Sequence, residues 1–147
     1  MSDSSLEKRI TRLEDIEAIK QLKAKYCEAC DDDHNQDKII AIFAEDGVWE
    51  GGDLGKAEGH AAIRELFAGF ERAIDFSQHN VMNPIIEITG TRATGIWYFM
   101  GPFTYNENAD NKMLAIRYDD EYVKIDGQWK YQHLRAKVRM LAELAIV

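Results

Sequence analysis

The hydrophobic period of this chain changes about halfway along, and that change restricts the folds open to it. Beyond residue 80, four long segments rich in β-branched and aromatic residues alternate with short turn signals, which predicts four successive strands. Strands joined by short turns pair antiparallel, so we expect a meander. The segments are 81–88, 93–103, 113–125 and 129–140, and the turn signals are Thr89-Gly90-Thr91, residues 106–111 and Asp126-Gly127.

The first half has helical spacing instead. Apolar residues three or four apart run from Leu6 to Tyr26, which predicts a long amphipathic helix that ends near Cys30. After the polar run DDDHNQD, the segment KIIAIFAED predicts a shorter helix that ends before Gly47 and forms a hairpin with the first. Helices followed by a meander make an α+β fold, and we expect one domain over residues 1–147.

A glycine-rich stretch, GGDLGKAEG, separates a short expected strand at Val48 and Trp49 from a third expected helix at residues 60–74. Glycines adopt turn conformations that other residues resist, so this stretch predicts a loop or pocket flap. It lacks the G-x-x-x-x-G-K-[ST] order of a phosphate-binding loop, and Lys56 is followed by alanine.

The charge and the composition exclude several classes of function. A formal net charge of -8 and scattered basic residues argue against nucleic acid as a partner. No segment approaches the roughly 20 apolar residues that cross a bilayer, and the polar start has no signal-peptide character, so we expect no membrane partner and a cytoplasmic protein. Cys27 and Cys30 lie at helical spacing without a second pair, which favours small groups on a buried face over a zinc or redox site.

The second of these strand segments, 93–103, is apolar on both faces, because the run from Ile96 to Met100 is uninterrupted. Helices can cover only one face of the sheet, so the other face needs a partner. We therefore expect a homo-oligomer, a dimer or a trimer, joined through the sheet. The apolar tail LAELAIV either continues the last strand or folds over the mouth of a cavity.

Three residues suggest an acid–base site. His79 stands at the mouth of an apolar strand, and the first helix ends with Tyr26 and Asp31. A histidine beside a carboxylate makes a proton shuttle near neutral pH. Tyr26 and Asp31 differ by about 140° around a continuous helix, so they share a site only if the helix ends or tightens near Cys30. The alternatives are a solvated aspartate cap, a structural histidine and a core tyrosine.

Two aromatic residues, Trp49 and Tyr98, are candidates for lining a pocket for a flat hydrophobic molecule, although such residues are also ordinary core. The remaining histidines, His34, His60 and His133, have the sequence surroundings of structural or solvent-facing residues. Of the three, His133 is the best candidate for a functional role, because it lies on the same strand face as Trp129 and Tyr131.

The order of several motifs resembles the SnoaL-like branch of the nuclear transport factor 2-like superfamily over almost the whole chain. The motifs are Y-x-x-x-x-D at residues 26–31, IFAEDGVWEG, EGHAAIRELF, HNVMNPIIEITGTRATGIWY and DGQWKYQHLR. The resemblance implies a cone-shaped α+β barrel whose helices and curved, mostly antiparallel sheet enclose one deep pocket. Scytalone dehydratase, bile acid 7α-dehydratase and hexachlorocyclohexane dehydrochlorinase have a pocket histidine and aspartate, which correspond to His79 and Asp31, and the bile acid enzyme has a tyrosine at the position of Tyr26.

The resemblance implies a lyase of the dehydratase type, or an isomerase, that needs no cofactor or metal and acts on a small hydrophobic cyclic molecule. His79 would be the base, Asp31 would hold its ring, and Tyr26 would donate a hydrogen bond. A non-catalytic ligand-binding or assembly module, and the small subunit of a ring-hydroxylating dioxygenase, are the alternatives in the same superfamily. Neither a G-x-S-x-G nor an H-E-x-x-H motif occurs to support a hydrolase or a zinc peptidase.

Overall fold

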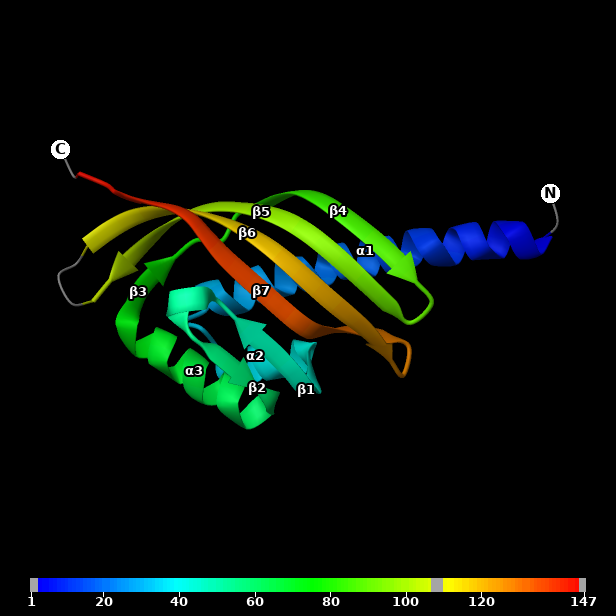
Figure 1. Ribbon diagram of the computed structural model, residues 1–147, viewed down its shortest axis with the longest axis horizontal. Helices are drawn as coiled ribbons and strands as arrows, with labels where there is room; N and C mark the ends of the chain where they lie inside the picture. The colour runs from blue at the N-terminus through cyan, green and yellow to red at the C-terminus, as the bar shows by residue number, and fades with distance from the viewer. Residues whose placement is uncertain (1–2, 107–109, 146–147) are drawn as a thin grey trace.

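The computed structural model describes residues 3–106 and 110–145. Helices pack against a strongly curled sheet that forms a half-barrel, which confirms the expected α+β cone (Figure 1). Within the described residues the helices are α1 (Asp3–Asp31), α2 (Gln36–Ile42) and α3 (Gly59–Ala73), with a short 3-10 helix η1 (Gly52–Leu54). The strands are β1 (Phe43–Glu50), β2 (Lys56–Glu58), β3 (Ile74–Ser77), β4 (Val81–Thr89), β5 (Arg92–Tyr105), β6 (Asp110–Ile125) and β7 (Gln128–Glu143).

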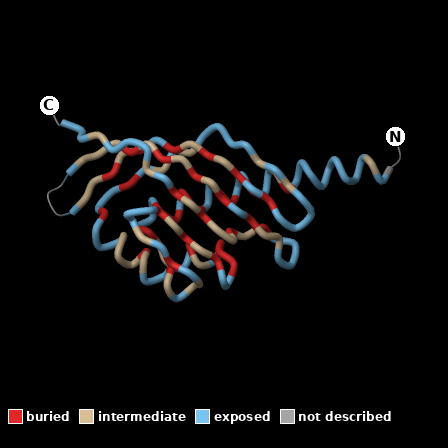
Figure 2. Tube along the Cα trace, in the orientation of Figure 1, coloured by how far each residue is buried: buried red, intermediate tan, exposed pale blue. Residues whose placement is uncertain are grey.

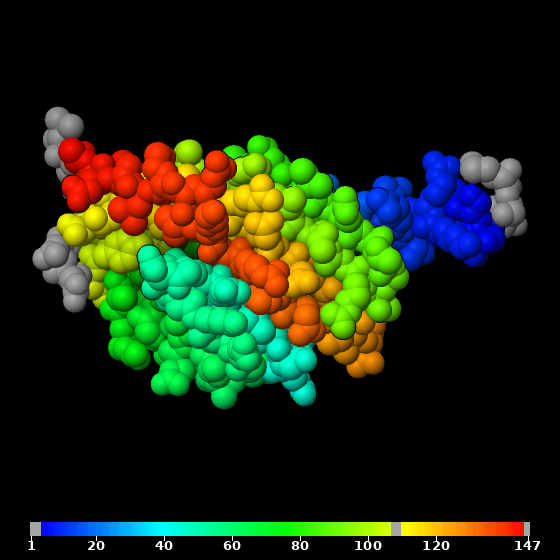
Figure 3. All heavy atoms as spheres, in the orientation of Figure 1, coloured from blue at the N-terminus to red at the C-terminus, as the bar shows by residue number. Residues whose placement is uncertain are grey.

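The sheet has the order β2-β1-β7-β6-β5-β3, and β4 also pairs with β5. The antiparallel meander from β4 to β7 is the one that the sequence predicts. At its edge, β1 pairs parallel with β7, with Trp49 opposite Leu134. β1 and the short helix η1 that follows it therefore lie beside β7 (Figure 3).

Two segment ends differ from the expected ones. Residues 43–46 belong to β1 rather than to the second helix, because α2 ends where Phe43 becomes extended and pairs with Tyr131 of β7. The two rings stack with centroids 5.1 Å apart, so a contact distant in sequence overrides local helical spacing. Ile74 likewise begins β3 and does not continue α3. Positions 107–109 of the second predicted turn, residues 106–111, lie outside the described residues.

The C-terminal segment continues the last strand, which was one of the two expected courses. β7 runs to Glu143, and the Leu144 N–H donates to the Asn111 carbonyl at 2.8 Å. Residues 146–147 of the tail lie outside the described residues. None of the helices in the described part of the chain combines the length and the apolar composition of a membrane span.

The apolar stripe of α1 is buried only in its second half. Ile19 and Leu22 pack into the core, whereas Leu6, Ile10 and Leu13 are exposed on the part of α1 that projects beyond the sheet (Figures 1 and 2). Cys27 and Cys30, in the buried half, are free thiols within the core, as expected.

The core holds a buried ion pair that the sequence pattern did not indicate. Lys23 Nζ lies 2.8 Å from Asp120 Oδ2, and both side chains are fully buried. Tyr122 donates to the same oxygen at 3.0 Å, and Lys23 Nζ lies 3.4 Å from the Tyr118 ring centroid. Burial raises the pKa of Asp120, and Lys23 opposes that effect.

Candidate functional site

The end of α1 determines where its last side chains point. Asp33 and His34 both adopt left-handed backbone conformations, with φ of 51° and 53°. The N–H groups of His34 and Asn35 bond back to the carbonyls of Cys30 and Ala29, each at 3.0 Å. Left-handed conformations cost residues other than glycine about 1–3 kcal/mol. This sharp exit ends α1 directly after Asp31, as the sequence argument required.

Asp31 lies within hydrogen-bond distance of three groups at the end of β3 and in the segment that joins β3 to β4. His79 Nδ1 lies 2.6 Å from Asp31 Oδ1, the His79 backbone N–H donates to Oδ2 at 2.8 Å, and the Ser77 hydroxyl donates to Oδ1 at 2.9 Å. The His79 side chain is 5% exposed, and that of Asp31 is 27% exposed. The carboxylate therefore holds Nδ1 and leaves Nε2 of the imidazole unused.

Electrostatics keep Asp31 ionised. Burial raises its pKa, but the hydrogen bonds from His79 and Ser77 and the charge of His79 lower it further, so the pKa lies below its usual value. An ionised Asp31 accepts a hydrogen bond from His79 Nδ1 and so sets the orientation of the ring.

A glycine allows this segment to approach the sheet. A Cβ at Gly101 would overlap the Gln78 carbonyl oxygen. Without it, Gln78 N–H reaches the Pro102 carbonyl at 3.1 Å, and Met100 N–H reaches the Asn80 carbonyl at 3.1 Å. These bonds hold His79 against β5, with its ring centroid 5.0 Å from that of Phe99.

His79 lines an apolar cavity of about 200 Å³ inside the half-barrel. Tyr26 and Trp49 line the same cavity, and the Trp49 indole N–H donates to the Tyr26 hydroxyl at 2.9 Å. Burial raises the pKa of Tyr26 well above its usual value, so its hydroxyl stays protonated and able to donate. The Tyr26 and His79 ring centroids are 6.3 Å apart. Other lining residues are Cys30, His34, Leu54, Phe67, Phe70, Ala73, Ile74, Phe103, Tyr105, Leu114, Ile116, Tyr118 and Ala136.

Tyr98 does not line this cavity, contrary to the expectation from the sequence. It lies on the other face of β5 from the buried Trp97 and Phe99, because neighbouring residues of a strand point to opposite faces. On that outer face its ring centroid is 5.8 Å from the Arg139 guanidinium.

His34 is the cavity residue that the sequence argument missed. It is buried, and its ring lies 5.7 Å from that of Phe70 and 6.5 Å from that of His79. Burial, helped by the charge of His79 and opposed by Asp31, lowers its pKa to about 4. The acidic run DDDH has the composition of a solvated loop, so no sequence signal marked this burial.

The other two histidines lie outside the cavity. His60 Nε2 is 2.9 Å from the Phe43 carbonyl oxygen, which holds the start of α3 against β1. His133 Nε2 is 2.8 Å from Glu50 Oε2, in a charged cluster that includes Glu121 and Arg135. Both positions agree with structural roles.

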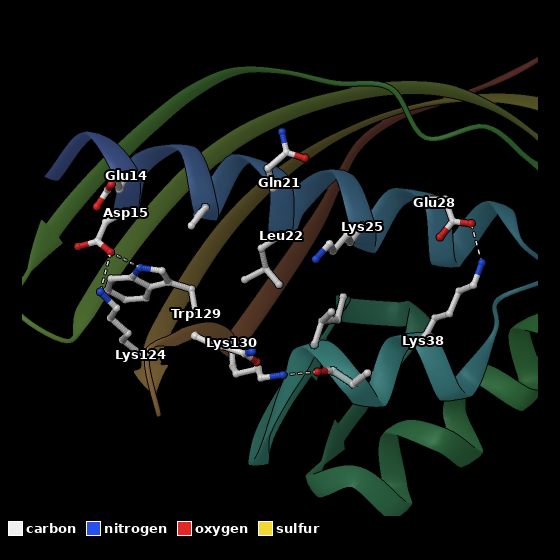
Figure 4. A pocket seen from close by; sticks show the side chains of 15 residues that line it. Glu14, Asp15, Gln21, Leu22, Lys25, Glu28, Lys38, Lys124, Trp129 and Lys130 are labelled. Carbon is white, nitrogen blue, oxygen red and sulfur yellow. Dashed lines mark hydrogen bonds and ion pairs between the residues drawn. The ribbon is translucent and has the colours of Figure 1, made fainter. Parts of the chain in front are cut away.

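A larger and more open groove of about 760 Å³ runs between α1, α2 and the β6–β7 turn (Figure 4). Its charged groups pair mainly with one another. Asp15 Oδ1 lies 2.9 Å from Lys124 Nζ and 2.8 Å from the Trp129 indole nitrogen, and Lys38 pairs with Glu28 at 2.6 Å. Because no histidine lines this groove, the acid–base pair belongs to the smaller cavity.

Comparison with known proteins gives this geometry a family. LinA Type2, a hexachlorocyclohexane dehydrochlorinase, is 20% identical over 95% of both chains, with a TM-score of 0.88. A Novosphingobium aromaticivorans protein provisionally named scytalone dehydratase is 23% identical, over 95% of this chain and 93% of that one, with a TM-score of 0.84. A protein of that organism provisionally named aromatic ring hydroxylase is 25% identical, over 90% and 94%, with a TM-score of 0.82. The SnoaL-like domain profile matches residues 11–135, so the chain belongs to the SnoaL-like domain family.

Proposed function

We propose that this protein is a cofactor-independent lyase of the dehydratase type that acts on a small hydrophobic cyclic molecule. The observation that carries the proposal is the His79–Asp31 pair, with Nδ1 and Oδ1 2.6 Å apart, in the wall of an apolar cavity. Elimination chemistry is also what the names of two structural neighbours describe, a dehydrochlorinase and a dehydratase.

In the proposed reaction, His79 Nε2 takes a proton from a carbon next to a carbonyl group. The electron pair of the broken C–H bond forms a C=C bond, and the C–O bond to the neighbouring hydroxyl breaks. The leaving oxygen then takes the proton from the imidazolium and departs as water. Asp31 stabilises the imidazolium between these transfers, and the Tyr26 hydroxyl donates to the carbonyl oxygen, where negative charge develops.

The cavity limits the size of the substrate. Its volume of about 200 Å³ is below the roughly 300–1,000 Å³ of pockets for drug-sized ligands. A molecule of one or two rings suits this volume better than a four-ring steroid. The wall is aromatic and aliphatic, so most of the affinity comes from burial of the apolar ring surface.

The test uses a two-ring β-hydroxy ketone, 3-hydroxy-1-tetralone, whose dehydration gives 1-naphthol and can be followed by absorbance. Exchange of the C2 protons of 1-tetralone with D₂O, followed by NMR, reports the proton abstraction alone. His79→Gln should slow both reactions by roughly 10²- to 10⁴-fold. Tyr98→Phe is the matched control, because Tyr98 lies outside the cavity, and it should leave both rates unchanged.

Turnover or exchange that survives in His79→Gln would contradict the assignment of the base. Tight binding of both ketones by the wild-type protein with neither reaction would instead favour a ligand-binding module of the same fold.

We also propose that the outer face of the sheet joins copies of this chain. Ile85 is 58% exposed, and Met100 and Met140 are each about half exposed. Met100 and Met140 both pair with Ala115 of β6, so they form one apolar row across three strands. Apolar rows of this kind on an open sheet are typical of subunit contacts.

A further inference from the structure

The cavity contains a second imidazole that the proposed reaction does not use. His34 is 4% exposed and lines the cavity together with His79. Its ring centroid is 6.5 Å from that of His79, with the two planes at 73°, and it packs against Phe67 and Phe70. The rest of the cavity wall is largely apolar, so the imidazole of His34 is one of the few polar groups that a ligand in the cavity would meet.

The hydrogen-bonding capacity of this ring is unused. Across residues 3–106 and 110–145, the His34 ring has no hydrogen bond, and only its backbone groups are bonded, including its N–H to Cys30. By contrast, the Trp49 indole N–H in the same cavity has a partner, because it donates to the Tyr26 hydroxyl. Buried polar groups normally have partners, so a buried imidazole without one points to a partner supplied by a ligand.

The backbone supports a functional reason for this histidine. His34 has a φ of 53°, a conformation in which glycine or asparagine is favoured at the end of a helix. The chain instead holds an imidazole there and packs it against two phenylalanine rings, those of Phe67 and Phe70. Backbone strain of this kind collects at functional sites.

We propose that His34 is a ligand-binding residue whose ring hydrogen-bonds an oxygen substituent next to the carbon that His79 deprotonates. This inference rests on the proposed function of His79. An oxygen that is hydrogen-bonded to an imidazole lies about 4 Å from the ring centroid. The centroids of His34 and His79 are 6.5 Å apart, so a ligand between them can place adjacent atoms within reach of both rings. The lowered pKa keeps His34 neutral at pH 7, with one N–H donor and one acceptor. A neutral donor and acceptor suits a hydroxyl or carbonyl oxygen, so the substrate class is a small cyclic molecule that carries oxygen at this position.

The experiment measures the preference for 1-naphthol over naphthalene by isothermal titration, in the wild-type protein and in three variants. His34→Gly removes the ring and suits the positive φ, so it should fold. His34→Gln keeps a hydrogen-bonding group. Phe70→Leu is the matched control, because Phe70 lines the same cavity and contacts His34 without a hydrogen-bonding group.

The wild-type protein should prefer 1-naphthol by about tenfold, the value of one hydrogen bond of ordinary strength. The preference should fall by about fivefold or more in His34→Gly, recover in part in His34→Gln and persist in Phe70→Leu. An equal loss of affinity for both compounds in His34→Gly, or a wild-type protein that does not distinguish them, would overturn the inference. These binding results do not depend on turnover, so they separate a failure at His34 from a failure of the proposed lyase reaction at His79.

Discussion

Acidification from pH 7 to pH 4 should destabilise this protein through His34. The pKa of His34 is about 4 in the folded protein and about 6.5 in an unfolded chain. Since the folded pKa is the lower one, the unfolded chain takes up this proton first as the pH falls. The contribution of a neutral His34 to stability is therefore complete above pH 6.5 and lost progressively down to about pH 4. A difference of about 2.5 pH units corresponds to about 3 kcal/mol of unfolding free energy.

The measurement is urea-induced unfolding of the wild-type protein and His34→Gln at pH 7, 6, 5 and 4. The unfolding free energy of the wild-type protein should fall by about 3 kcal/mol more than that of the variant across this range. Asp31 contributes equally to the unfolding free energy of both proteins. Because its pKa is lowered in the folded state, this contribution is lost only at still lower pH. Parallel pH profiles would refute the reasoning, since they would mean that the His34 ring is solvated when folded.

Two further predictions concern the core and the outer face. Lys23→Met should cost about 3–5 kcal/mol of unfolding free energy, because it leaves Asp120 buried without its cation. Adding Asp120→Leu should recover a substantial part of that loss. Urea unfolding of the single and the double variant checks this, and equal unfolding free energies of the two variants would contradict it. Ile85→Glu combined with Met100→Glu should reduce the molar mass found by light scattering to that of one chain, whereas a protein that is already monomeric, or an unchanged oligomer, would contradict the proposed contact.

Much of the architecture follows from local sequence. The change of period at residue 80 is sufficient to predict the antiparallel strands from β4 to β7, because short turns leave neighbouring strands no other pairing. The juxtaposition of Asp31 and His79 could be proposed because the first helix had to end near the DDD run. The resemblance to a family supplied the pairing itself, since 48 residues separate the two side chains.

Other features required the tertiary structure. Tyr98 lies in a run that is apolar on both strand parities, so the sequence could not say which face turns inward. Residues 43–46 have helical spacing, but their pairing with β7 makes them a strand.

By itself, the sequence determined the alternation of helices and strands, since apolar spacing and turn residues act over a few neighbours. Only the tertiary structure decided that the imidazole of His34 and the ammonium group of Lys23 are buried. A polar residue next to charged or apolar neighbours looks the same in a sequence whether it is solvated or enclosed. Its burial depends on segments far away along the chain, here α3 for His34 and β6 for Lys23.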